Sequence, residues 1–293
     1  MRTWIALFLL VSAVAAAAPS AVAAPLAIEP TSAALARAMR GHRVVLLGEV
    51  HDNADQHALR AAALRQWIMA GARPAIAFEQ FDREHQADID HARGERPMDA
   101  DHVIAQAQAG SGWDWALYRP YVALALEFDL PIVATNLSRA DAMRVATDGW
   151  DAVFDAATRR TLRLDALPAA VRRKQQSAIR IGHCNQLPAE AVPQLVRAQV
   201  ARDIVMAQLL RTYAARGVVL LAGNGHVRRD IGVPFWLGAD ARRDAISIGV
   251  LERDDRPVPE SAADFDAYVL TARAERADPC EAFTMRRPPA PAP

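Results

Sequence analysis

Lysine is almost absent from this chain of 293 residues, in which Lys174 is the only one and arginine supplies nearly all of the positive charge. Basic and acidic residues balance at 34 each, so the formal net charge is zero. A chain without an excess of either sign has no overall field that attracts nucleic acid or anionic membranes. We therefore expect no nucleic-acid partner.

Several motifs that would assign a chemistry are also missing. The chain has neither the lysine-bearing phosphate loop nor the Gly-x-Gly-x-x-Gly fingerprint, which leaves nucleotide binding without support. It lacks the Gly-x-Ser-x-Gly turn of serine hydrolases and the His-Glu-x-x-His spacing of zinc proteases. Because a Cys-x-x-Cys-His motif is missing as well, any haem would be bound non-covalently.

Cysteine is scarce, with Cys184 and Cys280 as the only two. They could form one disulfide in an oxidising compartment. This requires a fold that brings their Cα atoms to within roughly 4.4–6.8 Å of each other. The sequence leaves that question open.

The first 23 residues have the pattern of a cleaved signal peptide. Residues 4–18 form an apolar run after a positive start, and Ala21-Val22-Ala23 fits signal peptidase with cleavage before Ala24. The run is too short for a good membrane anchor, and no nearby cysteine could carry a lipid. We expect a periplasmic protein with no stable membrane anchor. Its proline-rich tail, residues 286–293, is expected to be disordered.

Strand-like and helix-like segments alternate along the rest of the chain, which predicts βαβ units and a parallel sheet. Short aliphatic runs predict buried strands at residues 44–47, 75–78, 131–134, 218–222 and 245–250, and an edge strand at 268–270. The fold class that we predict is α/β, with a mainly parallel sheet flanked by helices. One domain would span residues 24–285, with a helical cap insertion at about residues 139–193.

Polar side chains follow four of the predicted strands at their carboxyl ends. Two Gly-x-x-His segments, residues 48–51 and 223–226, supply one imidazole each. Because the carboxyl ends of parallel strands meet at one edge of a sheet, we expect these polar residues to share a crevice. They are Glu49, His51, Glu79, Asn136, Asn224 and His226.

Two chemistries fit such a crevice. Two histidines and two glutamates offer nitrogen and oxygen ligands to a divalent metal, which would acidify a bound water for hydrolysis. Alternatively, Glu49 and Glu79 could share a proton as general acid and base. A further histidine, His57, lies in the helix after His51 and is expected to face solvent.

A second candidate site lies outside the strands, at His183 and Cys184 ahead of a long predicted helix. Imidazole and thiolate both bind soft metals and haem iron, although a turn with a partly buried thiol is an equally good interpretation. Trp113 and Trp115 lie in a glycine-containing loop. They could form an apolar wall for a flat ligand, or pack in the core as large aromatic residues usually do.

Together these segments resemble the ChaN-like family of haem-binding uptake proteins, which belongs to the Tiki/TraB superfamily. The resemblance runs from about Gly41 to Leu237. Its markers are Leu47-Gly48-Glu49-Val50-His51-Asp52-Asn53, Phe78-Glu79-Gln80-Phe81-Asp82-Arg83, Ala134-Thr135-Asn136, Gly182-His183-Cys184 with Leu187-Pro188, Ala198-Gln199 with Arg202-Asp203 and Met206-Ala207, and Gly223-Asn224-Gly225-His226-Val227 with Gly232-Val233-Pro234.

The resemblance implies an α/β fold with a helical insertion and a role in haem or iron acquisition. Relatives with bound haem are similar to a dimer that stacks two porphyrins with tyrosine as an axial ligand, so a homodimer is implied. No tyrosine of this chain matches that position, and we predict His183 and Cys184 as the haem-binding residues instead. Other branches of the superfamily resemble metal-dependent proteases and esterases. The sequence thus predicts a periplasmic protein that binds haem, with a metal-dependent peptidase or esterase as the alternative.

In that alternative the strand-end residues would be both the metal ligands and the catalytic groups. The two Gly-x-x-His motifs and the paired glutamates that mark the superfamily correspond to Glu49, His51, Glu79 and His226.

Overall fold

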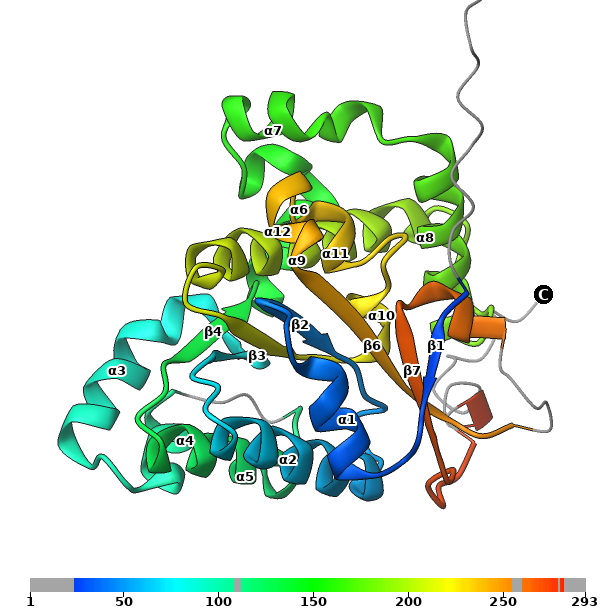
Figure 1. Cartoon of the computed structure of the whole chain (residues 1–293). Helices are drawn as coiled ribbons and strands as arrows, with labels where there is room; N and C mark the ends of the chain where they lie inside the picture. The colour runs from blue at the N-terminus through cyan, green and yellow to red at the C-terminus, as the bar shows by residue number, and fades with distance from the viewer. Residues whose placement is uncertain (1–23, 108–111, 255–259, 279, 282–293) are drawn as a thin grey trace, which may run out of the picture.

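The computed structural model describes residues 24–107, 112–254, 260–278 and 280–281. It contains one sheet of seven parallel strands in the spatial order β1-β7-β6-β2-β5-β3-β4 (Figure 1). The strands are β1 (Leu26–Ile28), β2 (Val44–Leu47), β3 (Ala75–Asp82), β4 (Ile132–Asn136), β5 (Val218–Leu221), β6 (Ala245–Glu252) and β7 (Ala267–Thr271). The predicted α/β class is confirmed. The predicted signal peptide, residues 1–23, and the predicted disordered tail, residues 286–293, lie outside the described residues.

Two strands differ from the sequence-based prediction. β7 is not at the edge of the sheet, because it pairs with β6 on one side and with β1 on the other. β1 was not predicted, since it has only three residues and two of them are exposed. An edge strand this short carries no alternation that a sequence pattern could reveal.

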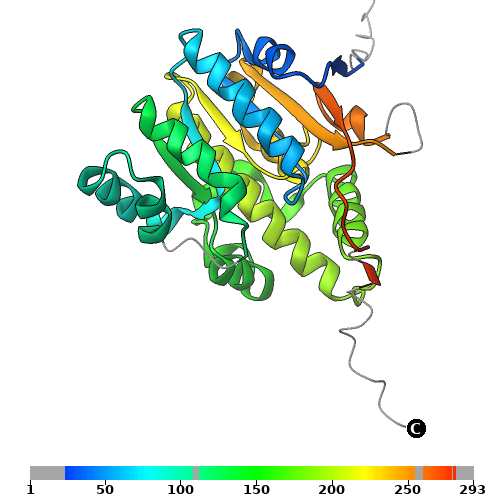
Figure 2. The same cartoon turned by 90° about the horizontal axis from the view of Figure 1, so that it is seen from below.

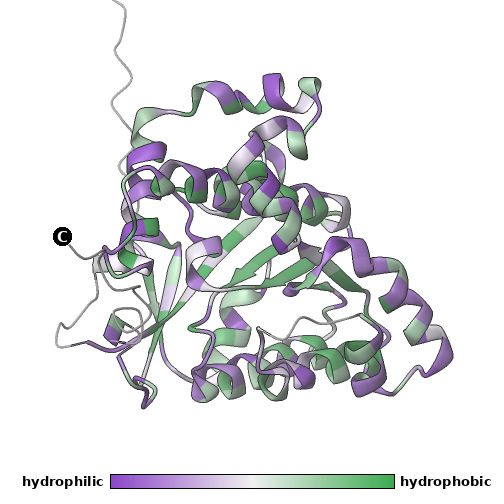
Figure 3. Cartoon of the chain, turned by 180° about the vertical axis from the view of Figure 1, so that it is seen from behind, coloured by the Kyte–Doolittle hydropathy of each residue, from purple (hydrophilic) through white to green (hydrophobic). Residues whose placement is uncertain are grey.

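The aliphatic runs form strands that are buried on both faces. All four residues of β2 are buried, and successive side chains point to opposite sides of the sheet. Val44 and Leu46 therefore pack in one core cluster, while Val45 and Leu47 pack in the other. Figure 3 shows these hydrophobic strands between two layers of helices.

Helices cover both faces of the sheet (Figures 1 and 2). The first face is covered by α1 (Ser32–Met39), α2 (Ala54–Met69), α3 (Gln86–Glu95), α4 (Ala100–Gln106) and α5 (Trp115–Glu127). The second is covered mainly by α6 (Arg139–Asp148), α9 (Ala191–Tyr213) and α11 (Val233–Trp236). The remaining helices are α7 (Ala156–Leu162), α8 (Ala169–Gly182), α10 (Asn224–Val227) and α12 (Ala239–Arg243). Short 3₁₀ turns lie at η1 (Arg83–His85), η2 (Trp150–Ala152), η3 (Leu164–Ala166) and η4 (Glu260–Asp264).

The segment from residue 139 to 193 is helical and contains no strand, in line with its sequence pattern. It carries α6, α7 and α8 and leads into α9, the longest helix of the described residues. Cys184, just after α8, forms a disulfide with Cys280, and the two Cα atoms are 5.5 Å apart. The bond ties this helical segment to the chain that follows β7. None of the described helices combines the length and the apolar character needed to cross a bilayer.

Candidate functional site

Three neighbouring strands bring the predicted polar residues together. β5 lies between β2 and β3, so the two Gly-x-x-His segments and the end of β3 meet at the carboxyl edge of the sheet. A pocket of about 580 Å³ opens there. Its lining residues are Glu49, Val50, His51, Glu79, Gln199, Arg202, Gly223, Asn224, Gly225 and His226.

His51 forms one side of this pocket. Its Nδ1 lies 2.9 Å from Glu49 Oε1, and its side chain is 47% exposed, whereas that of Glu49 is fully buried. A neutral imidazole that donates from Nδ1 keeps the lone pair of Nε2 for another partner. Burial acts to lower the pKa of His51, but the hydrogen bond to Glu49 and the charge of Glu79 outweigh it and raise that pKa.

Glu49 is held as an anion by groups from two helices. Arg60 of α2 donates from Nη1 to its Oε2 and forms a fully buried ion pair with it. The Tyr118 hydroxyl of α5 donates to Oε1 at 2.5 Å. Burial alone would raise the pKa of Glu49, but Arg60 and the hydrogen bond from His51 lower it to about 2. The carboxylate is therefore ionised at every physiological pH, and it fixes the orientation of His51.

His57 holds the backbone of His51 through a hydrogen bond. Its Nε2 donates to the backbone carbonyl of His51 at 3.0 Å, and the residue is only 3% exposed. The expectation that His57 faces solvent is therefore wrong. Burial and the nearby Arg60 lower its pKa, so it is a neutral donor in this network.

His226 forms the opposite side of the pocket and is buried. Its Nδ1 lies 2.6 Å from Asp203 Oδ1 of α9, and its Nε2 lies 3.3 Å from Glu79 Oε1. Burial opposes the charged form, but the two carboxylates outweigh it and raise the pKa of His226 to about 10. His226 is thus an imidazolium at neutral pH. Burial also raises the pKa of Asp203, to about 6.

Glu79 connects this imidazolium to the backbone of the second Gly-x-x-His segment. Its Oε2 accepts a 2.7 Å hydrogen bond from the Gly223 amide. Burial would raise its pKa, but His226 lowers it to about 2. A side chain on Gly223 would not fit, because a Cβ there would lie 2.7 Å from His51 Cε1 and 2.9 Å from His51 Nε2. The backbone of one motif therefore packs directly against the imidazole of the other.

The two asparagines connect segments around the pocket through hydrogen bonds. Asn224 donates from Nδ2 to the Val250 carbonyl and accepts from the Val250 amide, which joins the second motif to β6. Asn136, at the end of β4, accepts a 2.8 Å hydrogen bond from Arg202 Nη1 of α9. Asn224 thus lines the pocket, whereas Asn136 contacts it through Arg202.

Aromatic side chains border the His51 side. The Trp113 ring stands edge-on to the His51 ring, with 4.9 Å between centroids. Trp115 instead stacks on Phe81 and is part of the packing around β3. Trp113 is therefore the tryptophan placed to contact a flat ligand next to His51.

None of the four tyrosines offers an exposed phenol to the pocket. Tyr118 and Tyr121 are buried and donate to Glu49 and to the His57 carbonyl. Burial and the Glu49 carboxylate raise the pKa of Tyr118 far above its ordinary value, which disfavours a phenolate. Tyr213 and Tyr268 pack in or against the core cluster on the other face of the sheet.

His183 and Cys184 are not among the residues that line the pocket. His183 directly follows α8, and its Nδ1 lies 2.8 Å from the Ile179 carbonyl. The prediction that Cys184 binds haem iron as a thiolate does not fit the structure, because its sulfur is bonded to Cys280. The interpretation of Cys184 as part of a structural turn fits instead.

The donor set at the pocket does not fit a divalent metal. Within the part of the chain that the structure describes, no three His, Cys, Asp or Glu side chains are placed to hold a metal ion together. The Glu49 carboxylate is already bound by Arg60 and Tyr118. The Glu79 carboxylate is bound by His226 and the Gly223 amide. A haem iron needs fewer protein ligands than a divalent metal ion, because one or two axial ligands suffice. His51 Nε2 is a nitrogen of the kind that could serve as such a ligand, because the Glu49 carboxylate engages Nδ1.

Several residues of the site come from helices and not from strand ends, and their roles in it were not predicted. They are Arg60, Tyr118, Gln199, Arg202 and Asp203, of which the last three are markers of the family resemblance without an assigned role. One signal was available, because Arg60 occupies the same helical face as the buried Ala63, Leu64 and Trp67. A charged residue on an apolar face indicates a buried partner.

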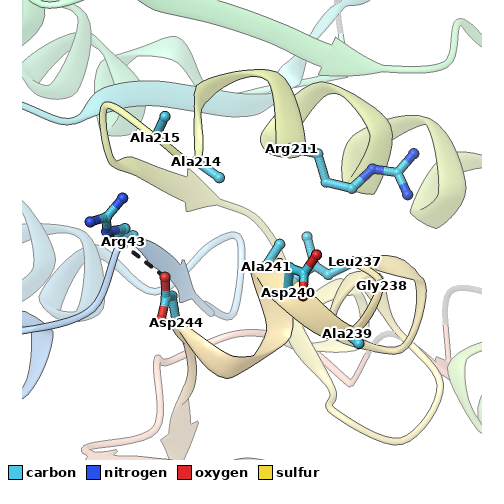
Figure 4. Close-up of a pocket in the computed structure, with 10 residues that line it drawn as sticks. All are labelled: Arg43, Arg211, Ala214, Ala215, Leu237, Gly238, Ala239, Asp240, Ala241 and Asp244. Carbon is cyan, nitrogen blue, oxygen red and sulfur yellow. Dashed lines mark ion pairs between the residues drawn. The ribbon is translucent and has the colours of Figure 1, made fainter.

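A second pocket of about 420 Å³ lies at the amino ends of β2 and β6 (Figure 4). Arg43 and Asp244 line it, with 3.8 Å between Arg43 Nε and Asp244 Oδ2, and both are exposed. Arg211, near the end of α9, points toward it. It contains none of the predicted site residues.

Comparison with known proteins agrees with this fold. The family model described as haem-binding uptake, Tiki superfamily, ChaN matches residues 35–237. The structure of ChaN of Campylobacter jejuni with cofacially bound haem is similar, with a TM-score of 0.62 and 20% sequence identity over 79% of this chain and 88% of that chain. The type III effector HopBA1 is more distant, with a TM-score of 0.46 and 12% identity over 84% of this chain and 94% of that one. No curated protein matches the chain.

Proposed function

The chain belongs to the ChaN family of haem-binding uptake proteins in the Tiki superfamily, and on this premise we propose that it binds haem non-covalently in the periplasm and serves haem or iron uptake. One observation carries the proposal. His51 is a half-exposed imidazole whose Nδ1 is engaged by a buried carboxylate, which leaves Nε2 as a ligand atom in the pocket. A carboxylate behind a ligating histidine fixes its orientation and increases its basicity.

This assignment differs from the one that the sequence suggested. The imidazole of His51 takes the place of His183 and Cys184, and Trp113 would contact the porphyrin face beside it. When bound, haem would supply iron for transport or storage. The residues of this chain would bind it, orient it and limit its contact with water.

The test is a titration of the purified protein with haemin, followed by the Soret band. We expect a saturable shift in the native protein and its loss in His51→Ala. His183→Ala and His91→Ala serve as controls, since His91 is an exposed histidine on α3. A Soret shift that survives His51→Ala but disappears in His183→Ala would show that His183, in the helical segment, binds the haem instead.

The periplasmic part of the proposal is supported by the signal-like residues 1–23 and by the disulfide, which forms in oxidising compartments. We expect the protein in the periplasmic fraction to begin at Ala24, as N-terminal sequencing would show. A homodimer is proposed from the same family. Light scattering of the protein with and without haemin should show a dimer in at least the haem-bound form.

A hydrolase is the second candidate, because two histidine–carboxylate pairs face one pocket. Nε2 of His51 could take a proton from water while the His226 imidazolium stabilises negative charge on the substrate. We expect any such activity on a p-nitrophenyl ester to survive EDTA and to be lost in His51→Ala. Activity that requires an added divalent metal would contradict this version.

A further inference from the structure

Arg202 is a half-buried cation of the pocket without a close anionic partner. It lies on α9 between Gln199 and Asp203, and its Nη1 donates to the neutral amide oxygen of Asn136 at 2.8 Å. A guanidinium carries five N–H groups in a rigid fork. Within the described ranges, no other acceptor and no carboxylate at ion-pairing distance are found for Arg202.

The other charges of the pocket are paired at short range. Glu49 contacts Arg60, and His226 lies between Asp203 and Glu79. Glu79, Asp82 and Asp203 reach Arg202 only through longer-range attraction. Burial outweighs that attraction and lowers the pKa of the Arg202 guanidinium, with a small contribution from the nearby Arg139. A cation in this state is stabilised by an anion that contacts it directly.

The geometry of the Arg202 guanidinium indicates which class of anion would bind to it. A planar guanidinium binds carboxylates and phosphates through two parallel hydrogen bonds, and Asn136 holds Arg202 toward the pocket from one side only. We propose that Arg202, positioned by Asn136, is the anion subsite of this pocket and takes a carboxylate of the bound molecule. If the proposed function holds, on which this identification of the ligand rests, that carboxylate is a propionate of haem.

The division of roles follows from the two sides of the pocket. His51 would determine whether iron is ligated, whereas Arg202 would determine whether a carboxylate is recognised. A change at Arg202 should therefore alter affinity and leave the iron coordination as it is. That difference separates a binding residue from one that only supports the fold.

The test compares haemin with haemin dimethyl ester, in which both propionates are neutral. The native protein should bind haemin roughly 10- to 100-fold more tightly than the ester, as expected for charge-assisted hydrogen bonds. Arg202→Gln should remove this preference while the Soret wavelength of bound haemin stays unchanged. Arg202→Lys should keep part of it. Arg211→Gln, at the exposed end of the same helix, should behave like the native protein.

A second probe contains no haem and therefore tests the anion subsite separately from the proposed haem binding. Benzoate, a flat carboxylate, should show saturation transfer in NMR with the native protein and none with Arg202→Gln. Equal affinity of the native protein for haemin and its ester would overturn the subsite and leave haem binding intact. Benzoate binding that depends on Arg202, without haemin binding, would keep the subsite and reject the haem function. Failure of both probes would reject both.

Discussion

The two Gly-x-x-His segments have the same pattern and opposite surroundings. His51 is half exposed and has one carboxylate, Glu49, whose charge is already balanced by Arg60. His226 is buried and has two carboxylates, Asp203 and Glu79, with no arginine at ion-pairing distance from either among the described residues. The first imidazole therefore keeps a nitrogen for a ligand, while the second is a fixed positive charge. The motif places a histidine, but the second layer of residues determines what the histidine does.

The largest effect is expected from removing the cation behind the first histidine. Arg60→Met leaves the buried Glu49 carboxylate without its ion pair, so the free energy of unfolding should fall by about 3–5 kcal/mol. Urea unfolding of both proteins measures the difference. Arg65→Met, on the same helix but in an exposed pair with Glu127, should change stability little. Equal losses in the two variants would show that the Arg60–Glu49 pair has no special role.

Tyr118→Phe tests the other donor to Glu49. It removes a buried hydrogen bond to a charged acceptor, which should reduce the free energy of unfolding by about 1.5–3 kcal/mol. Tyr121→Phe is a matched control on α5, because its hydroxyl donates to a neutral backbone carbonyl. We expect the smaller loss there, about 0.5–1.5 kcal/mol, by the same measurement. The reverse order would mean that Glu49 does not depend on Tyr118.

Gly223→Ala should break the contact between the two motifs. The added methyl group would lie 2.7 Å from His51 Cε1, so the imidazole must turn away from the position where Glu49 holds it. We expect haemin affinity to fall roughly 10- to 100-fold, as for other losses of support around a metal ligand. Gly94→Ala, on α3 and outside this pocket, has no atom within 4 Å of the added Cβ and should bind haemin like the native protein. If both variants bind equally well, His51 does not need this packing.

The second histidine is tested by alkaline pH. Its pKa is raised to about 10 in the folded protein, against about 6.5 in an unfolded chain. The stability that its proton provides is complete below pH 6.5 and is lost as pH rises toward 10. We expect the free energy of unfolding to fall by about 1 kcal/mol per pH unit between pH 7 and 9. His226→Gln should lack this slope, and an equal slope in both proteins would contradict an imidazolium at this position.

The strand residues of the site could be predicted, and the helix residues could not. Glu49, His51, Glu79 and His226 follow aliphatic runs, and the carboxyl ends of parallel strands must meet at one edge. Which face of a helix reaches that edge depends on how the helix packs. This is why the contacts of Tyr118 with Glu49 and of Asp203 with His226 were not predicted.

The predicted role of Cys184 as a haem ligand does not fit the structure, because its sulfur is in a disulfide. His183 and Cys184 are adjacent in the sequence and have residue types that bind iron. Pairing of Cys184 depends on a residue 96 positions away, which no local pattern reveals. The disulfide was left open for the same reason, because the distance between two Cα atoms is a property of the fold.

The disulfide also divides the chain into a closed ring and an open arm. The ring from Cys184 to Cys280 contains α9, β5, β6 and β7, and it carries Arg202, Asp203 and His226. His51, Glu79 and the groups that hold Glu49 belong to the open N-terminal part. Closing a ring of this length lowers the conformational entropy of the unfolded chain, which stabilises the folded protein by about 4–5 kcal/mol. Under a pulling force on the two ends, the open part would extend while the ring stays short, so the pocket would be lost by separating its two sides before the ring itself unravels.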